Sequence, residues 1–207
     1  MTQDYNYWKD RNPDDTQKDW KIDGSWLEGY EKSVSHPHRK LVVKSLRGME
    51  SILEVGSSCG PNLLALSRKH PEARLFGVDA NQDAVNSAAR LIPSAGVSQG
   101  DIIKGLPFKD GSFDAVLADA VLMYVNPHEI LDVMSEMDRV SSKRIVVVDR
   151  FANARLGVDT GYIWHRNYGQ LLQEMGYKVR KIKLTQETWP HSRGWATHGY
   201  VWVGNRI

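Results

Sequence analysis

The sequence has 207 residues, 41% hydrophobic and 25% charged, which is ordinary for a soluble globular protein and long enough for one domain with a small appendage. Its formal net charge of +2 argues against nucleic acid or an anionic membrane surface as a partner. One cysteine excludes an intrachain disulfide, no signal segment is visible, and the longest aliphatic run, 145–148, is far short of the roughly 20 residues of a membrane span, so we expect a cytoplasmic protein.

Residues 1–49 differ in character from the rest of the chain. They are rich in charged and aromatic residues and show little apolar periodicity. Short helices are expected around 25–32 and over 38–46, the second after Pro37, which suits a first helical turn. We predict a small N-terminal helical cap over 1–49 and a second unit over 50–207.

From residue 50 onward, apolar strands alternate with amphipathic helices. The strands are expected at 51–55, 74–78, 96–100, 113–118, 144–149, 177–184 and 198–204, and the helices at 61–70, 81–91, 127–139 and 166–175. This alternation predicts an α/β fold, a Rossmann-like open sheet of about seven strands with helices on both faces. No helix is expected between the last two strands, so the parallel sheet should end in an antiparallel hairpin.

The turn after the first strand, in SILEVGSSCGPN (51–62), is rich in glycine. Gly56 and Gly60 would let the backbone turn sharply beside a ligand, and Pro61 suits the first turn of the next helix. Asp79 ends the second strand, 19 residues past Gly60, where an acid can accept hydrogen bonds from the ribose of an adenosine. After the third strand, Asp101 and the backbone of Ile102 would stand beside the adenine.

Four segments carry a resemblance to a known family. LEVGSSCG, FGVDAN, GDI and LPFKDGSFDAVLADAVLMYV, in this order and spacing, resemble class I S-adenosylmethionine-dependent methyltransferases over about residues 50–204. The resemblance implies S-adenosylmethionine as the cofactor, S-adenosylhomocysteine as the product and these cofactor-binding residues: Glu54, Gly56, Ser57, Ser58, Gly60, Asn62, Asp79, Ala80, Asp101, Ile102, Ala118 and Asp119. Ser58 stands where the family often has a glycine, and a serine can line this turn if its backbone dihedrals stay ordinary.

Charge favours a sulfonium compound over a dinucleotide at this turn. A pyrophosphate would avoid acids such as Glu54 and Asp119, whereas a positive sulfur and an ammonium group suit them. The G-x-x-x-G spacing also departs from the dinucleotide pattern. A nicotinamide-dependent oxidoreductase is the alternative from a different class.

The acceptor would lie beyond the carboxyl ends of the strands, between the loops 119–127 and 150–165 and the N-terminal segment. All seven tryptophans lie in 8–26 or 164–202, which suggests aromatic cover from both ends of the chain. Asp119 and His165 are candidate catalytic bases. The candidate acceptor-binding residues are Tyr124, Arg150, Arg155, Tyr162 and Trp164.

The acceptor class follows from what the sequence offers and lacks. Methyl transfer to an oxygen or nitrogen atom of a small molecule is expected, and the arginines make an anionic acceptor sensible. DAVL (119–122) stands where DNA amino-methylating enzymes carry an N-P-P-Y-like motif, which disfavours nucleic acid. A protein or peptide acceptor, another reaction of the same cofactor and a binding module remain alternatives. No metal site is expected, since no ligand cluster accompanies His36 and His38. A monomer or homodimer is expected.

Overall fold

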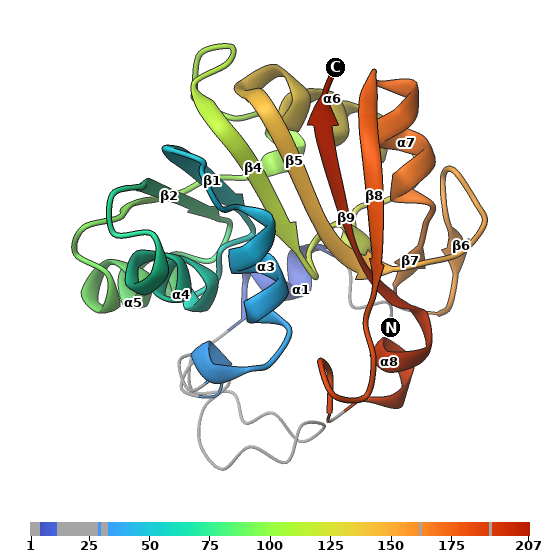
Figure 1. Cartoon of the computed structure of the whole chain (residues 1–207), viewed down its shortest axis with the longest axis horizontal. Helices are drawn as coiled ribbons and strands as arrows, with labels where there is room; N and C mark the ends of the chain where they lie inside the picture. The colour runs from blue at the N-terminus through green and yellow to red at the C-terminus, as the bar shows by residue number, and fades with distance from the viewer. Residues whose placement is uncertain (1–4, 12–28, 30–32, 162, 191) are drawn as a thin grey trace.

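The structure, a computed structural model, describes residues 5–11, 29, 33–161, 163–190 and 192–207. Within them seven strands form one sheet in the order β3-β2-β1-β4-β5-β9-β8 (Figure 1). The strands are β1 (Ser51–Val55), β2 (Arg74–Asp79), β3 (Gly96–Gln99), β4 (Phe113–Asp119), β5 (Ser141–Arg150), β8 (Tyr177–Lys183) and β9 (Gly199–Arg206). The first five pair in parallel, and β9 runs antiparallel between β5 and β8. The predicted Rossmann-like sheet with a terminal antiparallel pair is confirmed.

Helices cover both faces of this sheet. They are α1 (Tyr5–Lys9), α3 (Arg39–Ser45), α4 (Pro61–Lys69), α5 (Gln82–Leu91), α6 (Ile130–Val140), α7 (Tyr168–Glu174) and α8 (Arg193–His198). Side chains alternate along β4: Ala115 and Leu117 pack with α3 and α4, whereas Val116 and Ala118 pack with α6 and α7. None of the helices in the described part of the chain is long and apolar enough to span a membrane.

One local expectation is contradicted by the structure, and one short strand pair was not expected. The helix expected over 25–32 lies outside the described residues apart from Gly29, and the one expected over 38–46 is α3, for which His38 is the N-cap. The expectation of no helix between the last two strands is wrong, because α8 lies there, with the Ser192 hydroxyl accepting from the amide of Trp195. The short antiparallel pair of β6 (Val158–Asp159) and β7 (Trp164–His165) was not predicted.

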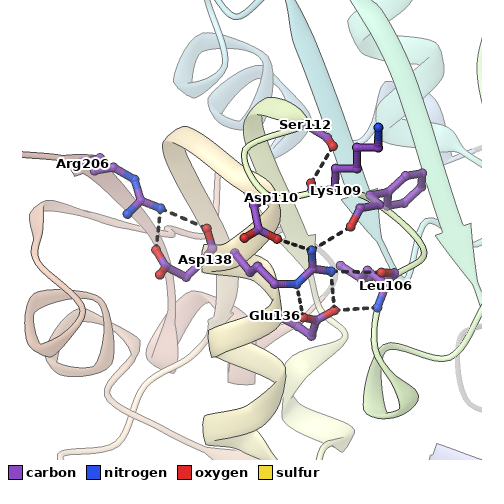
Figure 2. A network of polar contacts seen from close by, with 9 residues as sticks. Leu106, Lys109, Asp110, Ser112, Glu136, Asp138 and Arg206 are labelled. Atoms are coloured by element: carbon purple, nitrogen blue, oxygen red, sulfur yellow. Dashed lines mark hydrogen bonds and ion pairs between the residues drawn. The ribbon is translucent and has the colours of Figure 1, made fainter.

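The loop before β4 is fastened to the C-terminal turn of α6 by Arg139. Its guanidinium donates to the carbonyls of Leu106 and Phe108 and to the carboxylates of Asp110 and Glu136, over 2.5–3.0 Å. Figure 2 shows this network together with the amide of Leu106, which donates to Glu136. The network fixes where β4 begins, and thereby the position of its far end.

The carboxyl ends of the parallel strands meet at one edge of the sheet. Figure 1 shows α1, α3 and α8 at the edge where β4 and β5 end. These helices come from opposite ends of the chain, so both termini contribute to the same edge. Ligands of open α/β sheets bind at this edge.

Candidate functional site

The turn between β1 and α4 is built from backbone with positive φ. Gly56, Ser58 and Gly60 have φ angles of 67°, 49° and 79°. A Cβ on Gly56 would lie 2.4 Å from Cγ2 of Val121, so only glycine allows the turn to pack on the loop after β4. Ser58 does not keep ordinary dihedrals, since it lies in the left-handed region that favours glycine.

Asp79, at the end of β2, holds this turn. Its Oδ2 accepts from the amide of Ser58 at 2.7 Å and its Oδ1 from the amide of Asn81 at 2.9 Å. Burial raises the pKa of this carboxyl, although the backbone donors oppose the shift. The side chain of Asn81 caps α5 and also donates to the carbonyls of Trp8, Lys9 and Arg11 at 2.9–3.3 Å. The end of β2 therefore ties the glycine turn to the N-terminal helix α1.

A cavity of about 120 Å³ lies between these elements. Seven residues of the sequence-predicted site line it: Gly56, Ser58, Asp79, Ala80, Ile102, Asp119 and Tyr124. The other lining residues are Trp8, Val78, Asn81, Gly100, Ala120, Val121 and Val125. Trp8 reaches over from α1, with its ring centroid 5.3 Å from that of Tyr124, and its Nε1 has no partner among the described residues.

Six predicted cofactor residues do not line the cavity. Ser57 and Ala118 are buried, and Gly60 is the N-cap of α4. Asp101 accepts from the amide of Ile103 at 3.0 Å and caps the short helical turn 102–104. Glu54 and Asn62 belong to a polar network deeper in the protein.

That network joins β1, α4 and β4 through Asn62. Its Nδ2 donates to Glu54 Oε1 at 2.6 Å and to Asp119 Oδ2 at 2.8 Å. Its Oδ1 accepts from Arg39 Nη1 at 2.6 Å. One oxygen of each carboxyl group, Oε2 of Glu54 and Oδ1 of Asp119, is buried with no hydrogen-bond partner in the described part of the chain.

The two carboxyl groups of the network have different charge states, one neutral and one negative. Burial raises the pKa of Glu54 to about 8, so this side chain is protonated at neutral pH. Burial also acts on Asp119, but the neighbouring His38, Arg39 and Asn62 outweigh it and lower the pKa of Asp119 to about 2. Asp119 is thus a carboxylate at neutral pH and a poor acceptor of a proton from a substrate.

Two histidines that precede α3 reach this carboxylate. His38 Nε2 lies 2.8 Å from Asp119 Oδ2, and His36 Nδ1 lies 2.6 Å from His38 Nδ1. Both rings pack against Trp189, with centroids 4.8 Å and 4.3 Å away, and Trp189 stacks on Trp195 at 4.1 Å. Among the described residues, no group of three or more His, Cys, Asp or Glu residues is arranged to hold a metal ion.

Of the residues predicted for the acceptor side, Arg150 lies beside the candidate base His165, whereas Arg155 lies elsewhere. Arg150 lies over the ring of Trp195 at 5.1 Å, and the partly buried His165 beside it has a pKa lowered to about 4 by burial and by the charges of Arg150 and His198. Arg155 instead pairs with Glu174 at 2.7 Å on the surface.

Trp164 is partly buried, with the guanidinium of Arg166 5.9 Å from its ring. Tyr162 lies outside the described residues. The structure therefore brings Arg150 and His165 together and leaves Arg155 apart from them.

Sequence reasoning missed four side chains of the site: His38, Arg39, Asn81 and Trp189. The spacing of His36 and His38 was noted, but their contact with Asp119 joins residues 81 positions apart, which no local pattern signals. Asn81 does carry a signal, because an asparagine directly after a strand and before a helix is a typical N-cap.

A family model and one relative match part of this chain. Residues 52–144 match a family model described as a methyltransferase domain. Trans-aconitate 2-methyltransferase of Paracidovorax citrulli is 27% identical over 103 residues, which span 49% of this chain and only 40% of that protein's length.

Solved structures show the same fold. A SAM dependent methyltransferase from Aquifex aeolicus is 16% identical with a TM-score of 0.62, covering 87% of this chain and 98% of that one. Magnesium protoporphyrin IX methyltransferase from Synechocystis PCC 6803, with bound SAM, is 15% identical with a TM-score of 0.63, covering 93% and 86%.

Proposed function

We propose that this chain is a class I methyltransferase that uses S-adenosylmethionine to methylate an oxygen or nitrogen atom of a small molecule. Its fold and the family model that residues 52–144 match support the proposal. The cavity between the glycine turn, Asp79 and the end of β4 carries this proposal. Two acids line it, and none of its described lining residues is Lys or Arg. Such a lining suits a cationic ligand and does not suit a pyrophosphate.

The residues present fit this cofactor. The buried Oδ1 of Asp119 has no partner in the described part of the chain, and it would accept from the ammonium of the methionyl group. Asp79 would bind the ribose hydroxyls, and the apolar Val78 and Ile102 with Trp8 would enclose the adenine. The bound cofactor would supply a methyl group on a positive sulfur. The protein's share is to align the acceptor and to exclude water.

The deeper predicted residues would act by shaping the site. Asn62 fixes the carboxylate of Asp119, Glu54 fixes Asn62, and Ser57, Gly60 and Ala118 shape the turn and the strand end. We propose a role through these neighbours for this group, and direct contact for the residues that line the cavity. Asp101, which caps the short helical turn 102–104, would stand beside the adenine.

The acceptor side is proposed to include residues from both ends of the chain. Trp8 lines the cavity and His38 contacts Asp119, so residues 1–49 would serve as a cap on the unit 50–207. Arg150 and His165 would contact the acceptor, where a guanidinium favours an anionic group. By their names, trans-aconitate 2-methyltransferase and magnesium protoporphyrin IX methyltransferase act on small molecules, which supports the same class here.

A calorimetric titration tests the cofactor. We expect S-adenosylhomocysteine to bind with a micromolar dissociation constant and NADH not to bind. Asp79→Ala should weaken binding at least about tenfold, because the ribose loses a hydrogen-bond acceptor and the glycine turn loses the bond from the Ser58 amide. Asp132→Asn, on the exposed side of α6, is the matched control and should bind as the wild type does. Binding of NADH alone, or equal affinity in Asp79→Ala, would overturn the proposal.

A further inference from the structure

We propose that Trp8 binds the carboxylate of the cofactor's methionyl group through its indole N–H. The inference rests on the proposed cofactor and adds a binding residue from the N-terminal segment, outside residues 52–144 that match the family model. Trp8 belongs to α1, and it lines the same cavity as Asp119.

Two buried side-chain atoms of the cavity's described lining residues have no hydrogen-bond partner in the described part of the chain. One is a donor, Nε1 of Trp8, and the other is an acceptor, Oδ1 of Asp119. A buried polar atom without a partner costs free energy, so a ligand that supplies both partners is favoured. An α-amino acid carries an ammonium and a carboxylate on one carbon atom, and it thus offers the donor and the acceptor that this pair lacks.

An unpartnered indole N–H is not by itself a sign of a ligand. Nε1 of Trp202, on β9, is also buried without a partner among the described residues, yet Trp202 does not line the cavity. It packs against Tyr168 in the core. Trp8 differs because its N–H and an unpartnered acceptor belong to residues that border one cavity.

The backbone of Trp8 is fixed by the residues that follow β2. Nδ2 of Asn81 donates to the carbonyls of Trp8, Lys9 and Arg11 at 2.9–3.3 Å. The last carbonyls of a helix have no partner within it, so these bonds fasten the C-terminal end of α1 two positions after Asp79.

The indole ring of Trp8 reaches the segment that follows β4. Its centroid lies 5.3 Å from that of Tyr124, in the short helical turn 122–124. Trp8 therefore joins the strand end proposed for the ribose to the strand end that carries Asp119. The methionyl group is bonded to the ribose through the sulfur, so it would follow this line when its ammonium reaches Asp119.

The charges around the cavity leave a carboxylate in need of this donor. Asp79 and Asp119 line the cavity, and none of its described lining residues is Lys or Arg. A carboxylate that enters there must take hydrogen bonds from neutral donors, namely backbone amides and the indole N–H. The guanidinium of Arg11 lies 5.1 Å from the ring centre of Trp8, and its positive charge favours a negative group near that ring.

Calorimetric titration of the full chain with two ligands tests the contact. S-adenosylhomocysteine has the carboxylate and the ammonium, whereas its decarboxylated form keeps only the ammonium. We expect the wild type to prefer S-adenosylhomocysteine by at least about tenfold, because the decarboxylated form lacks a hydrogen bond to a charged group.

Trp8→Phe keeps an aromatic ring beside Tyr124 and lacks the N–H. It should bind S-adenosylhomocysteine about tenfold more weakly than the wild type does, and its preference over the decarboxylated form should shrink by the same factor. Trp202→Phe is the matched control, since it also removes an unpartnered indole N–H, and it should keep the wild-type preference. Unchanged affinity for S-adenosylhomocysteine in Trp8→Phe, or an equal loss for both ligands, would overturn the contact.

A second measurement does not depend on how a variant folds. In the wild type, the proton–nitrogen signal of the Trp8 indole should move to lower field with S-adenosylhomocysteine, as its N–H becomes bonded, and should not do so with the decarboxylated form. The indole signal of Trp202 is the internal reference. A Trp8 signal that stays in place at saturating S-adenosylhomocysteine would overturn the contact alone. No binding of S-adenosylhomocysteine to the wild type would overturn the proposed function, and the contact with it.

Discussion

Glu54→Gln should make the protein more stable at neutral and alkaline pH. Burial raises the pKa of Glu54 from 4.5 to about 8, so the folded state must keep this carboxyl protonated while the unfolded chain ionises it freely. A raised pKa stabilises the folded state fully below the unfolded pKa, and that stability is lost as the pH rises through the folded pKa. Since each pKa unit corresponds to about 1.4 kcal/mol, the cost at pH 7 is about 3 kcal/mol, and it falls below about 1 kcal/mol at pH 5.

Glutamine avoids this cost and keeps an oxygen that can accept from Asn62. Its amide nitrogen replaces Oε2, which has no partner among the described residues, and this lost solvation reduces the gain. We expect the free energy of unfolding to rise by about 1–3 kcal/mol at pH 7 and by less at pH 5. Urea unfolding at both pH values measures it, with the exposed Glu72→Gln as the matched control. A gain independent of pH would refute the assignment of a protonated Glu54.

Three further substitutions probe the turn and the network. Ser58→Gly should raise the unfolding free energy by about 1 kcal/mol, because a left-handed φ of 49° costs a serine about that much; thermal unfolding no better than wild type would contradict the strain. Gly56→Ala should destabilise the protein and abolish S-adenosylhomocysteine binding in a titration, since the added Cβ would lie 2.4 Å from Val121. Adding Val121→Ala should restore part of the lost stability. If stability does not recover, that clash is not the cause. With a pKa of about 2, Asp119 contributes stability that is lost as the pH falls from about 4 to about 2. The unfolding free energy should therefore fall more steeply with decreasing pH in the wild type than in Asp119→Asn. Equal slopes would count against an ionised Asp119.

The sheet could be predicted because its signals are local. β1 and β4 are short apolar runs buried on both faces, and β1, β2, β4 and β5 are each followed along the chain by an α-helix, so most strand and helix ranges can be read from neighbouring residues. The exception is β3, a mostly exposed strand at the edge of the sheet with no α-helix before β4. The helix α8 was missed because RGWATH is short and contains glycine, and its stability comes from Trp195, which is buried against Trp189. Tertiary packing, and not local helix propensity, therefore stabilises α8.

Several residues that line the cavity could be predicted from the same local signals. The glycine turn, the acid that ends β2 and the segment after β4 all follow strands, and the sheet brings strand ends together. The conformation of Ser58 could not be predicted. Its left-handed backbone is held by the hydrogen bond that its amide donates to the carboxylate of Asp79, a contact between residues 21 positions apart. Tertiary contacts can therefore hold a serine in the left-handed backbone conformation that glycine adopts without strain.

Asp119 connects the two sides of the site, and its two oxygens explain why. Oδ2 forms hydrogen bonds with His38 and Asn62. Oδ1 is buried and has no hydrogen-bond partner among the described residues, and Asp119 lines the cavity. A cation bound at Oδ1 and the residues bound at Oδ2 thus share one negative charge. Since burial of an unpaired carboxylate is costly, the segment before α3 must stay docked for the site to keep its charge. The segment before α3 and the proposed cofactor site are therefore linked through the side chain of Asp119 at the end of β4.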